Sequence, residues 1–145
     1  MEINILTPDE LHDETHLVEL TNFLFEHLGK YGDPREHIRA AIDYSISQQK
    51  GKGGFVVVAQ EQKKILGVVV VNETGMDGYI PSNILVYIAV DEASRGKGIG
   101  KKLTETVIEK AKGGIALHVE PDNPARKLYE KLGFTNKYLE MRLQQ

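Results

Sequence analysis

One junction in the sequence constrains the fold more than any other feature. An apolar run, Ile84–Val90, leads into the glycine-rich segment Arg95–Gly100 and then into a helical pattern. A continuously apolar run of this length is typical of a central strand covered on both faces. Glycine allows positive φ and close approach to a ligand, and the first turn of a helix presents unpaired N–H groups that favour an anion. We therefore predict a phosphate or pyrophosphate site, to which Arg95, Lys97 and Lys101 add positive charge.

Two familiar phosphate-binding loops do not match this segment. The P-loop requires GxxxxGK followed by Ser or Thr, whereas Lys101 is followed here by Lys102. The dinucleotide-binding fingerprint is GxGxxG, whereas the glycines from Gly96 to Gly100 are spaced GxGxG. The loop also lies late in the chain, and no second nucleotide-binding half follows it.

The rest of the chain alternates helical and strand patterns around a hairpin. A mixed sheet with helices on both faces accounts for this order, so we predict an α/β fold. The length of 145 residues suits a single domain, residues 1–145. In the first half of the chain we expect a strand at 1–6, a helix ending near Gly29, a helix capped by Asp33 with Pro34 at its first position, and strands at 55–59 and 65–71. A loop at 72–83 then leads to the strand Ile84–Val90 and to a helix from Ile99 to Ala111. The last elements are a strand at 115–119, a helix capped at Asp122–Pro124 and ended by Gly133, and one or two closing strands at 134–143.

Composition and charge restrict the function classes. The chain has no cysteine, which excludes disulfides, thiolate metal sites and a cysteine nucleophile. The net charge of -3 argues against non-specific nucleic-acid binding. No stretch approaches the roughly 20 apolar residues that span a bilayer, and the N-terminus lacks the basic start and apolar core of a signal peptide. We expect a cytoplasmic protein with neither a membrane nor a nucleic acid as partner.

The histidines do not indicate a metal site. His12 and His16 have helical i,i+4 spacing, but no HExxH pattern exists and the sequence places no carboxylate partner beside them. The other three histidines are scattered. We predict no bound metal.

A second segment supports a more specific interpretation of the glycine loop. Residues Asn123–Phe134 contain Ala125, then Leu128-Tyr129, then Gly133-Phe134. Together with Arg95–Gly100, this segment resembles the motifs of the GNAT family, the Gcn5-related N-acetyltransferases. The resemblance covers Ile84–Leu143 closely and the first half of the chain only by topology. It implies the acyl-CoA N-acyltransferase fold, acetyl-CoA as acyl donor and a primary amine as acceptor.

The resemblance also implies a coenzyme site. The family separates two neighbouring parallel strands, here 84–90 and 115–119, and the pantetheine arm lies between them. Pantetheine amides pair with the backbone groups that are freed, and a strand N–H polarises the thioester carbonyl. The implied coenzyme-binding residues are Ile88, Val90, Arg95, Gly96, Lys97, Gly98, Ile99, Gly100, Lys101, Asn123 and Arg126. A helix cap is a second role for Asn123, and solvent exposure without a ligand is the alternative for Arg126.

Tyr129 is the implied catalytic residue. It matches the tyrosine that serves the family as general acid, and a phenol with a pKa of roughly 10 carries a proton at neutral pH. Its helical face also contains Ala125 and Leu132. A purely structural role in the core is therefore the alternative.

The general base is left open by the sequence. Several family members place a carboxylate four residues before the first amide donor, where this chain has Ile84. Glu73, Asp77, Glu120 and Tyr87 are candidates, as is loss of the amine proton to solvent. The acceptor pocket is expected between the two N-terminal helices and the 72–83 loop, lined by Phe23, Phe25, His27, Tyr31 and Tyr44.

The predicted function is transfer of an acetyl group from acetyl-CoA to a primary amine of a small molecule, peptide or protein, such as a ribosomal protein. A non-catalytic acyl-CoA-binding or regulatory domain is the alternative, because Ile84 stands where relatives have a carboxylate. By analogy with relatives that pair through their late strands, we also expect a homodimer.

Overall fold

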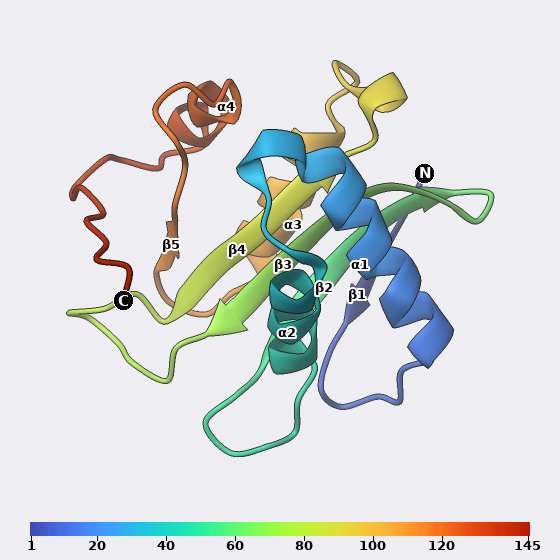
Figure 1. The fold of residues 1–145 in the computed structure, drawn as a ribbon, viewed down its shortest axis with the longest axis horizontal. Coiled ribbons are helices and arrows are strands. Elements are labelled where there is room, and N and C mark those ends of the chain that lie inside the picture. Colours follow the sequence, from blue (N-terminus) through green and yellow to red (C-terminus); the bar gives the residue numbers. More distant parts are fainter.

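A computed structural model describes residues 1–145, the whole chain. It contains one five-stranded sheet in the order β1-β2-β3-β4-β5 (Figure 1). The elements are β1 (Glu2–Leu6), α1 (Glu14–Leu28), the 3-10 turn η1 (Gly29–Tyr31), α2 (Arg35–Ser45), β2 (Gly54–Glu61), β3 (Lys64–Glu73), β4 (Asn83–Val90), η2 (Glu92–Ser94), α3 (Ile99–Lys110), β5 (Ile115–Leu117) and α4 (Ala125–Lys131). None of the helices is long and apolar enough to cross a bilayer.

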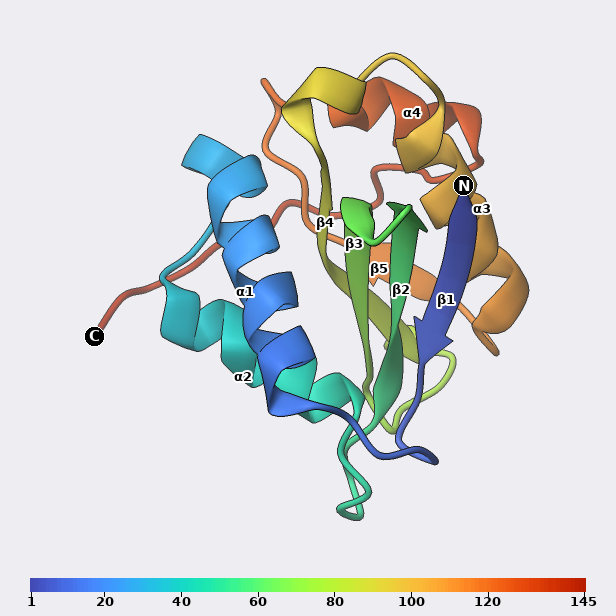
Figure 2. The ribbon, with the colours of Figure 1, turned by 90° about the vertical axis from the view of Figure 1, so that its right-hand side faces the viewer.

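The sheet is mixed and is covered on both faces, as predicted. Neighbouring strands from β1 to β4 pair antiparallel, whereas β4 and β5 pair parallel. Helices α1 and α2 cover one face and α3 covers the other (Figure 2). In β3, residues Val68–Val71 are fully buried, because alternate side chains enter the two cores that these layers enclose.

Strand β4 contains a β-bulge at Val86. Tyr87 is paired with Val70, whereas Leu85 is paired with the next residue of β3, Val71. One extra residue in a strand bends it and reverses the alternation of its side chains. Leu85 and Ile88 accordingly pack in the same core, on the α3 side of the sheet.

The parallel pairing of β4 with β5 ends at the bulge. Its last pair is Leu85 with Leu117, and the chain after Leu117 leaves the sheet. The predicted strand 115–119 is therefore shorter than expected, because His118 and Val119 have no strand beside them. The expectation that the whole run Ile84–Val90 is covered on both faces is wrong, since several of its side chains are only half-buried.

The predicted closing strands at 134–143 are wrong. No strand follows α4, and the tail runs away from the sheet (Figure 2). Its apolar side chains Tyr138, Leu139, Met141 and Leu143 are exposed. A strand requires a partner for its backbone groups, and the tail has none within this chain.

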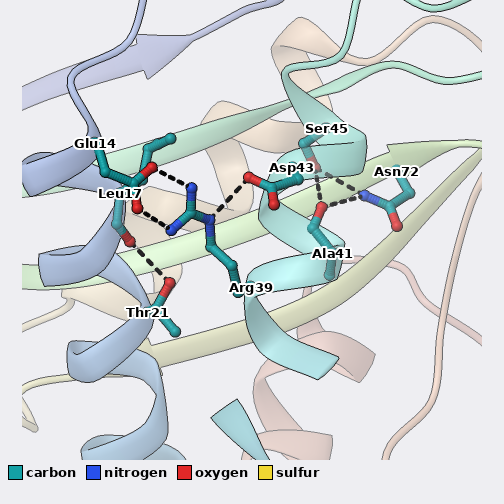
Figure 3. Close-up of polar contacts among 8 residues, drawn as sticks. All are labelled: Glu14, Leu17, Thr21, Arg39, Ala41, Asp43, Ser45 and Asn72. Carbon is teal, nitrogen blue, oxygen red and sulfur yellow. Dashed lines mark hydrogen bonds and ion pairs between the residues drawn. The ribbon is translucent and has the colours of Figure 1, made fainter. Parts of the chain in front are cut away.

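Helix α2 is fastened to the sheet by buried polar groups (Figure 3). The Ser45 hydroxyl lies 2.8 Å from the carbonyl oxygen of Val71. It lies 3.1 Å from the carbonyl oxygen of Ala41, a contact that Figure 3 shows. It also accepts a 2.8 Å hydrogen bond from Nδ2 of Asn72. These contacts connect the end of α2 to the end of β3. They thereby help to fix the position of the whole α1–α2 layer.

Helices α1 and α2 are joined to each other by Arg39. Its guanidinium donates to both carboxylate oxygens of Glu14, at 2.8 and 2.5 Å, and to Oδ1 of Asp43 at 2.9 Å (Figure 3). The pKa of the exposed Glu14 carboxyl is lowered by the Arg39 hydrogen bonds. The bidentate geometry orients α2 relative to α1 more than it stabilises the fold, because exposed ion pairs contribute little.

We predict that Ser45→Ala lowers the free energy of unfolding by about 1–3 kcal/mol, because it removes a buried hydroxyl that bonds the Val71 carbonyl and leaves the Asn72 amide only its 3.1 Å hydrogen bond to the Ala41 carbonyl. Chemical denaturation measures the change. The control is Ser47→Ala, whose hydroxyl accepts only an exposed turn hydrogen bond and which should cost about 0.5 kcal/mol or less. Equal losses in the two variants would contradict the role of Ser45.

Candidate coenzyme site

The edge of β4 that faces β5 is open beyond the bulge. The Asp91 N–H donates to the Leu66 carbonyl of β3 at 2.8 Å. Since backbone groups alternate along a strand, the N–H groups of Ile88 and Val90 point the opposite way, toward the side where β5 has left. Two backbone donors thus lie on an unpaired strand edge and require a partner.

The glycine loop has the backbone that the sequence predicted. Gly96 and Gly98 have φ of 83° and 82°, a region that residues with a side chain rarely adopt. A Cβ at either position would meet no atom within 4 Å, so the space above the loop is free. Helix α3 begins at Ile99 with Gly98 as a cap that offers no side-chain acceptor.

The first turn of α3 presents its N–H groups to this space. The first intrahelical bond runs from the Lys102 N–H to the Gly98 carbonyl at 3.0 Å. The N–H groups of Ile99, Gly100 and Lys101 therefore have no acceptor in the helix. Lys97 and Lys101 are exposed beside them. Unpaired donors, a helix dipole and two ammonium groups suit an anion such as a pyrophosphate.

The loop, the open edge and α4 meet at Gly100. A Cβ built on Gly100 would lie 3.7 Å from Cγ2 of Val90 and 3.6 Å from Cδ2 of Leu128. The end of β4 and helix α4 therefore both pack on the first turn of α3. This arrangement brings Tyr129, the neighbour of Leu128, to the same end of the sheet as Val90.

Arg95 braces the loop in this structure. Its Nη2 donates to the His27 carbonyl at 3.0 Å, and its Nε lies 3.4 Å from the Val90 carbonyl. Beside it, the Ser94 hydroxyl donates to Asp91 at 3.0 Å. These contacts tie the loop to the end of α1 and to the end of β4. The charge of Arg95 still contributes to the positive potential around the glycines.

The side chain of Tyr129, a residue of α4, is buried, and its ring centroid lies 5.9 Å from that of Phe134. Burial raises the pKa of Tyr129 to about 12, so the phenol keeps its proton at neutral pH. The hydroxyl makes no hydrogen bond within the chain. Since the only buried side-chain polar atom without a partner is Nδ1 of His27, the Tyr129 oxygen must retain some access to solvent or to a ligand.

The two remaining coenzyme-binding candidates lie at the start of α4. Asn123 Oδ1 accepts a 3.0 Å hydrogen bond from the N–H of Ala125, the first residue of α4, although the cap position itself is Pro124. The amide nitrogen of Asn123 makes no hydrogen bond within the chain. Arg126 lies 3.9 Å from Glu130 on the helix. Both residues line an open surface concavity together with Pro121, Asp122, Pro124, Lys127 and Glu130.

Comparison with known proteins decides the family. Residues 52–136, more than half of the chain, match the family model of the acetyltransferase (GNAT) domain. The chain belongs to the GNAT family.

Relatives of known activity agree with this assignment. The glucosamine 6-phosphate N-acetyltransferase of Arabidopsis thaliana is 29% identical over 81% of this chain and 70% of its own length. The 5-NmdU N-acetyltransferase of Pseudomonas phage PaMx11 is 32% identical over 57% of this chain, which spans 58% of that relative. An aminoglycoside N-acetyltransferase solved in complex with CoA shares the fold, with a TM-score of 0.68 at 19% identity over 99% of this chain and 95% of its own.

These comparisons support acetyl transfer from acetyl-CoA to an amine as the chemistry of this GNAT domain. The open edge of β4 suits the amide-bearing pantetheine arm, and the first turn of α3 suits the pyrophosphate. The residues present thus fit the coenzyme that the family uses.

Among the candidates for the general base, the fold separates two from the open edge. Glu73 is paired with Asn83, the first residue of β4, and Asp77 lies in the loop just before it. Five residues of strand, roughly 16 Å, separate that end from Ile88. Glu73 and Asp77 are therefore badly placed, whereas Tyr87 is adjacent to Ile88.

The predicted aromatic lining of the acceptor pocket is not gathered in one place. Phe23 is buried in the core, and the Tyr44 hydroxyl donates to backbone carbonyls of Gly51 and Glu73, the nearer at 2.8 Å. Phe25 is partly exposed and carries the Arg35 guanidinium 4.0 Å from its ring centre. Only Tyr31 reaches toward the segment that follows β5.

Sequence reasoning missed Asp33. It was predicted to cap α2, but the cap position is Pro34 and makes no side-chain hydrogen bond. The Asp33 carboxylate instead accepts a hydrogen bond from the Tyr87 hydroxyl. Burial and this hydrogen bond raise the pKa of Tyr87. No sequence signal could have revealed the pair, because its members are 54 positions apart.

We predict that Gly98→Glu weakens acetyl-CoA binding by about 10²-fold or more, since a carboxylate about 4 Å from a phosphate costs on the order of 4 kcal/mol at an effective dielectric constant of about 20. Calorimetric titration measures the affinity. Gly78→Glu is the matched control, because Gly78 has a similar φ of 73° and equally free space but lies in the loop before β4. Unchanged affinity in Gly98→Glu would remove the loop from the coenzyme site.

Proposed function

We propose that this chain transfers the acetyl group of acetyl-CoA to a primary amine of a small molecule, peptide or protein. The observation that carries the proposal is the open edge of β4, where the N–H groups of Ile88 and Val90 lie beside the glycine-capped start of α3. No other part of the fold offers unpaired strand donors next to an anion site. The GNAT assignment supplies the chemistry that this geometry serves.

Binding of the coenzyme divides between two parts of the site. The N–H groups of Ile99, Gly100 and Lys101 receive the pyrophosphate, with Lys97 adding charge. Ile88, Val90 and the free amide nitrogen of Asn123 pair with the amides of the pantetheine arm. Arg95 acts by holding the loop, and Arg126 reaches a phosphate only if it leaves Glu130.

The reaction joins the amine nitrogen to the thioester carbonyl carbon, breaks the carbon–sulfur bond, and leaves an amide and a CoA thiol. An N–H of Ile88 or Val90 stabilises the oxyanion of the tetrahedral intermediate. Such a preoriented donor typically contributes about 10²- to 10³-fold in rate. The proton that the amine loses passes to solvent or to a base on the acceptor side.

Tyr129 interacts with the sulfur atom of the leaving CoA. A phenol with a pKa of about 12 is roughly 3 to 4 pKa units too weak to protonate a free thiolate with a pKa of about 8.5. Donation of a hydrogen bond to the sulfur as negative charge develops is therefore the role that its chemistry supports best. Solvent then completes the protonation of the released thiolate.

The names of the relatives indicate which acceptors to test and favour an active enzyme. The Arabidopsis thaliana relative acts on glucosamine 6-phosphate and the phage relative on 5-NmdU, as their names state. These names favour an active enzyme over a non-catalytic acyl-CoA-binding domain. A small amine is accordingly the first acceptor class to test, ahead of a protein.

Assembly and location stay predictions. The exposed apolar side chains of the tail, Tyr138, Leu139, Met141 and Leu143, support a homodimer in which a second copy covers them. The open outer edge of β5 is a second surface that such a copy could pair with. A cytoplasmic location rests on the sequence alone.

We predict that Tyr129→Phe lowers kcat by about 10²-fold, the scale for losing one hydrogen-bond donor to charge that develops in the transition state, with little change in acetyl-CoA affinity. Release of the CoA thiol in the presence of an amine panel measures kcat, and calorimetry measures the affinity. Tyr138→Phe, on the exposed tail, is the control and should match the wild type. Full activity in Tyr129→Phe would assign Tyr129 to the core only, and absence of acetyl-CoA binding in the wild type would refute the function.

A further inference from the structure

The connector between α1 and α2, residues 29–34, lies across the end of the open β4 edge. On one side, Lys30 Nζ contacts Oδ2 of Asp122 at 3.1 Å and the Tyr31 hydroxyl lies 3.4 Å from the Asp122 carbonyl. On the other side, Asp33 accepts a hydrogen bond from Tyr87 of β4. The connector is thus attached both to β4 and to the segment that follows β5, the two parts of the chain that separate at the bulge. Figure 1 shows it at the same end of the sheet as α4.

Asp33 lies on the acceptor side of the reacting atoms. The Tyr87 side chain projects from β4 into the α1–α2 layer, and Tyr87 immediately precedes Ile88, whose N–H lies on the open edge. The anion site at the start of α3 lies toward the opposite layer. A molecule that approaches Ile88 from the α1–α2 side therefore passes the pair of Tyr87 and Asp33.

No cation of the chain neutralises Asp33. Lys30 is paired with Asp122. Arg35 donates to Asn22 at 3.1 Å and stacks on Phe25. The one partner of Asp33 is the neutral Tyr87 phenol, which orients the carboxylate without cancelling its charge. Asp33 is an exposed residue, and its second carboxylate oxygen accepts no hydrogen bond within the chain.

We propose that Asp33, oriented by Tyr87, binds an ammonium group of the acceptor next to the amine that is acetylated. This inference rests on the proposed function and names its substrate class: amines that carry at least one further positive charge, such as diamines and polyamines. A carboxylate without a cationic partner attracts such a group, and the hydrogen bond from Tyr87 fixes the direction of the carboxylate. Tyr87 acts here as a positioning residue and Asp33 as a binding residue.

The test uses three amines that differ by one ammonium group each: butylamine, 1,4-diaminobutane and spermidine. Thiol release gives kcat/KM for each amine. In the wild type we expect kcat/KM to rise at least about tenfold from butylamine to 1,4-diaminobutane. In Asp33→Asn the ratio should fall to about one, with the KM for acetyl-CoA unchanged. Tyr87→Phe should reduce the ratio to an intermediate value.

Glu36→Gln is the matched control, because Glu36 is an exposed carboxylate in the first turn of α2 and should leave the ratio as in the wild type. A wild-type ratio near one, or an unchanged ratio in Asp33→Asn, overturns the inference. Binding of acetyl-CoA without turnover of any of the three amines also overturns it, and turnover of glucosamine 6-phosphate would then preserve the proposed function. Failure to bind acetyl-CoA defeats both.

Discussion

The bulge at Val86 is the constraint on which the rest of the site depends. One inserted residue moves the register of β4 against β3 and reverses which backbone groups face each edge. Without it, the N–H groups of Tyr87 and Ala89 would point toward β5, and Ile88 and Val90 would pair with β3. The same position is where β5 leaves β4. A single irregularity therefore both opens the edge and selects the donors that occupy it.

The two helical layers position different parts of the site. On one side, the apolar face of α3 packs on the sheet and holds the glycine-capped first turn beside the end of β4. On the other side, α1 and α2 are joined by Arg39 and fastened to β3 by Ser45. Their connector is thereby held over the open edge, where Asp33 meets Tyr87. In the proposed site, the acetyl donor and the amine acceptor thus approach the bulge from opposite faces of the sheet.

Local features were predictable from the sequence because their causes are local. Helical spacing gave the four main helices, and the GxGxG segment required the positive φ found at Gly96 and Gly98. The bulge could not be predicted, because Ile84–Val90 is apolar throughout and hides any reversal of alternation. The alternating tail residues 139, 141 and 143 have the pattern of a strand, but pairing depends on a neighbour that the chain does not supply. The partner of Asp33 depends on a contact between distant positions, so the capping pattern Asp-Pro was misleading there.

Amide hydrogen exchange of the free and CoA-saturated protein tests the central claim most directly. The open edge predicts that the amides of Ile88 and Val90 exchange rapidly in the free protein, whereas the amide of Ala89, which faces β3, is protected. Addition of CoA should protect Ile88 and Val90 and leave Ala89 unchanged. Protection of Ile88 and Val90 before CoA is added, or no change after it, would contradict the assignment of this edge as the coenzyme site.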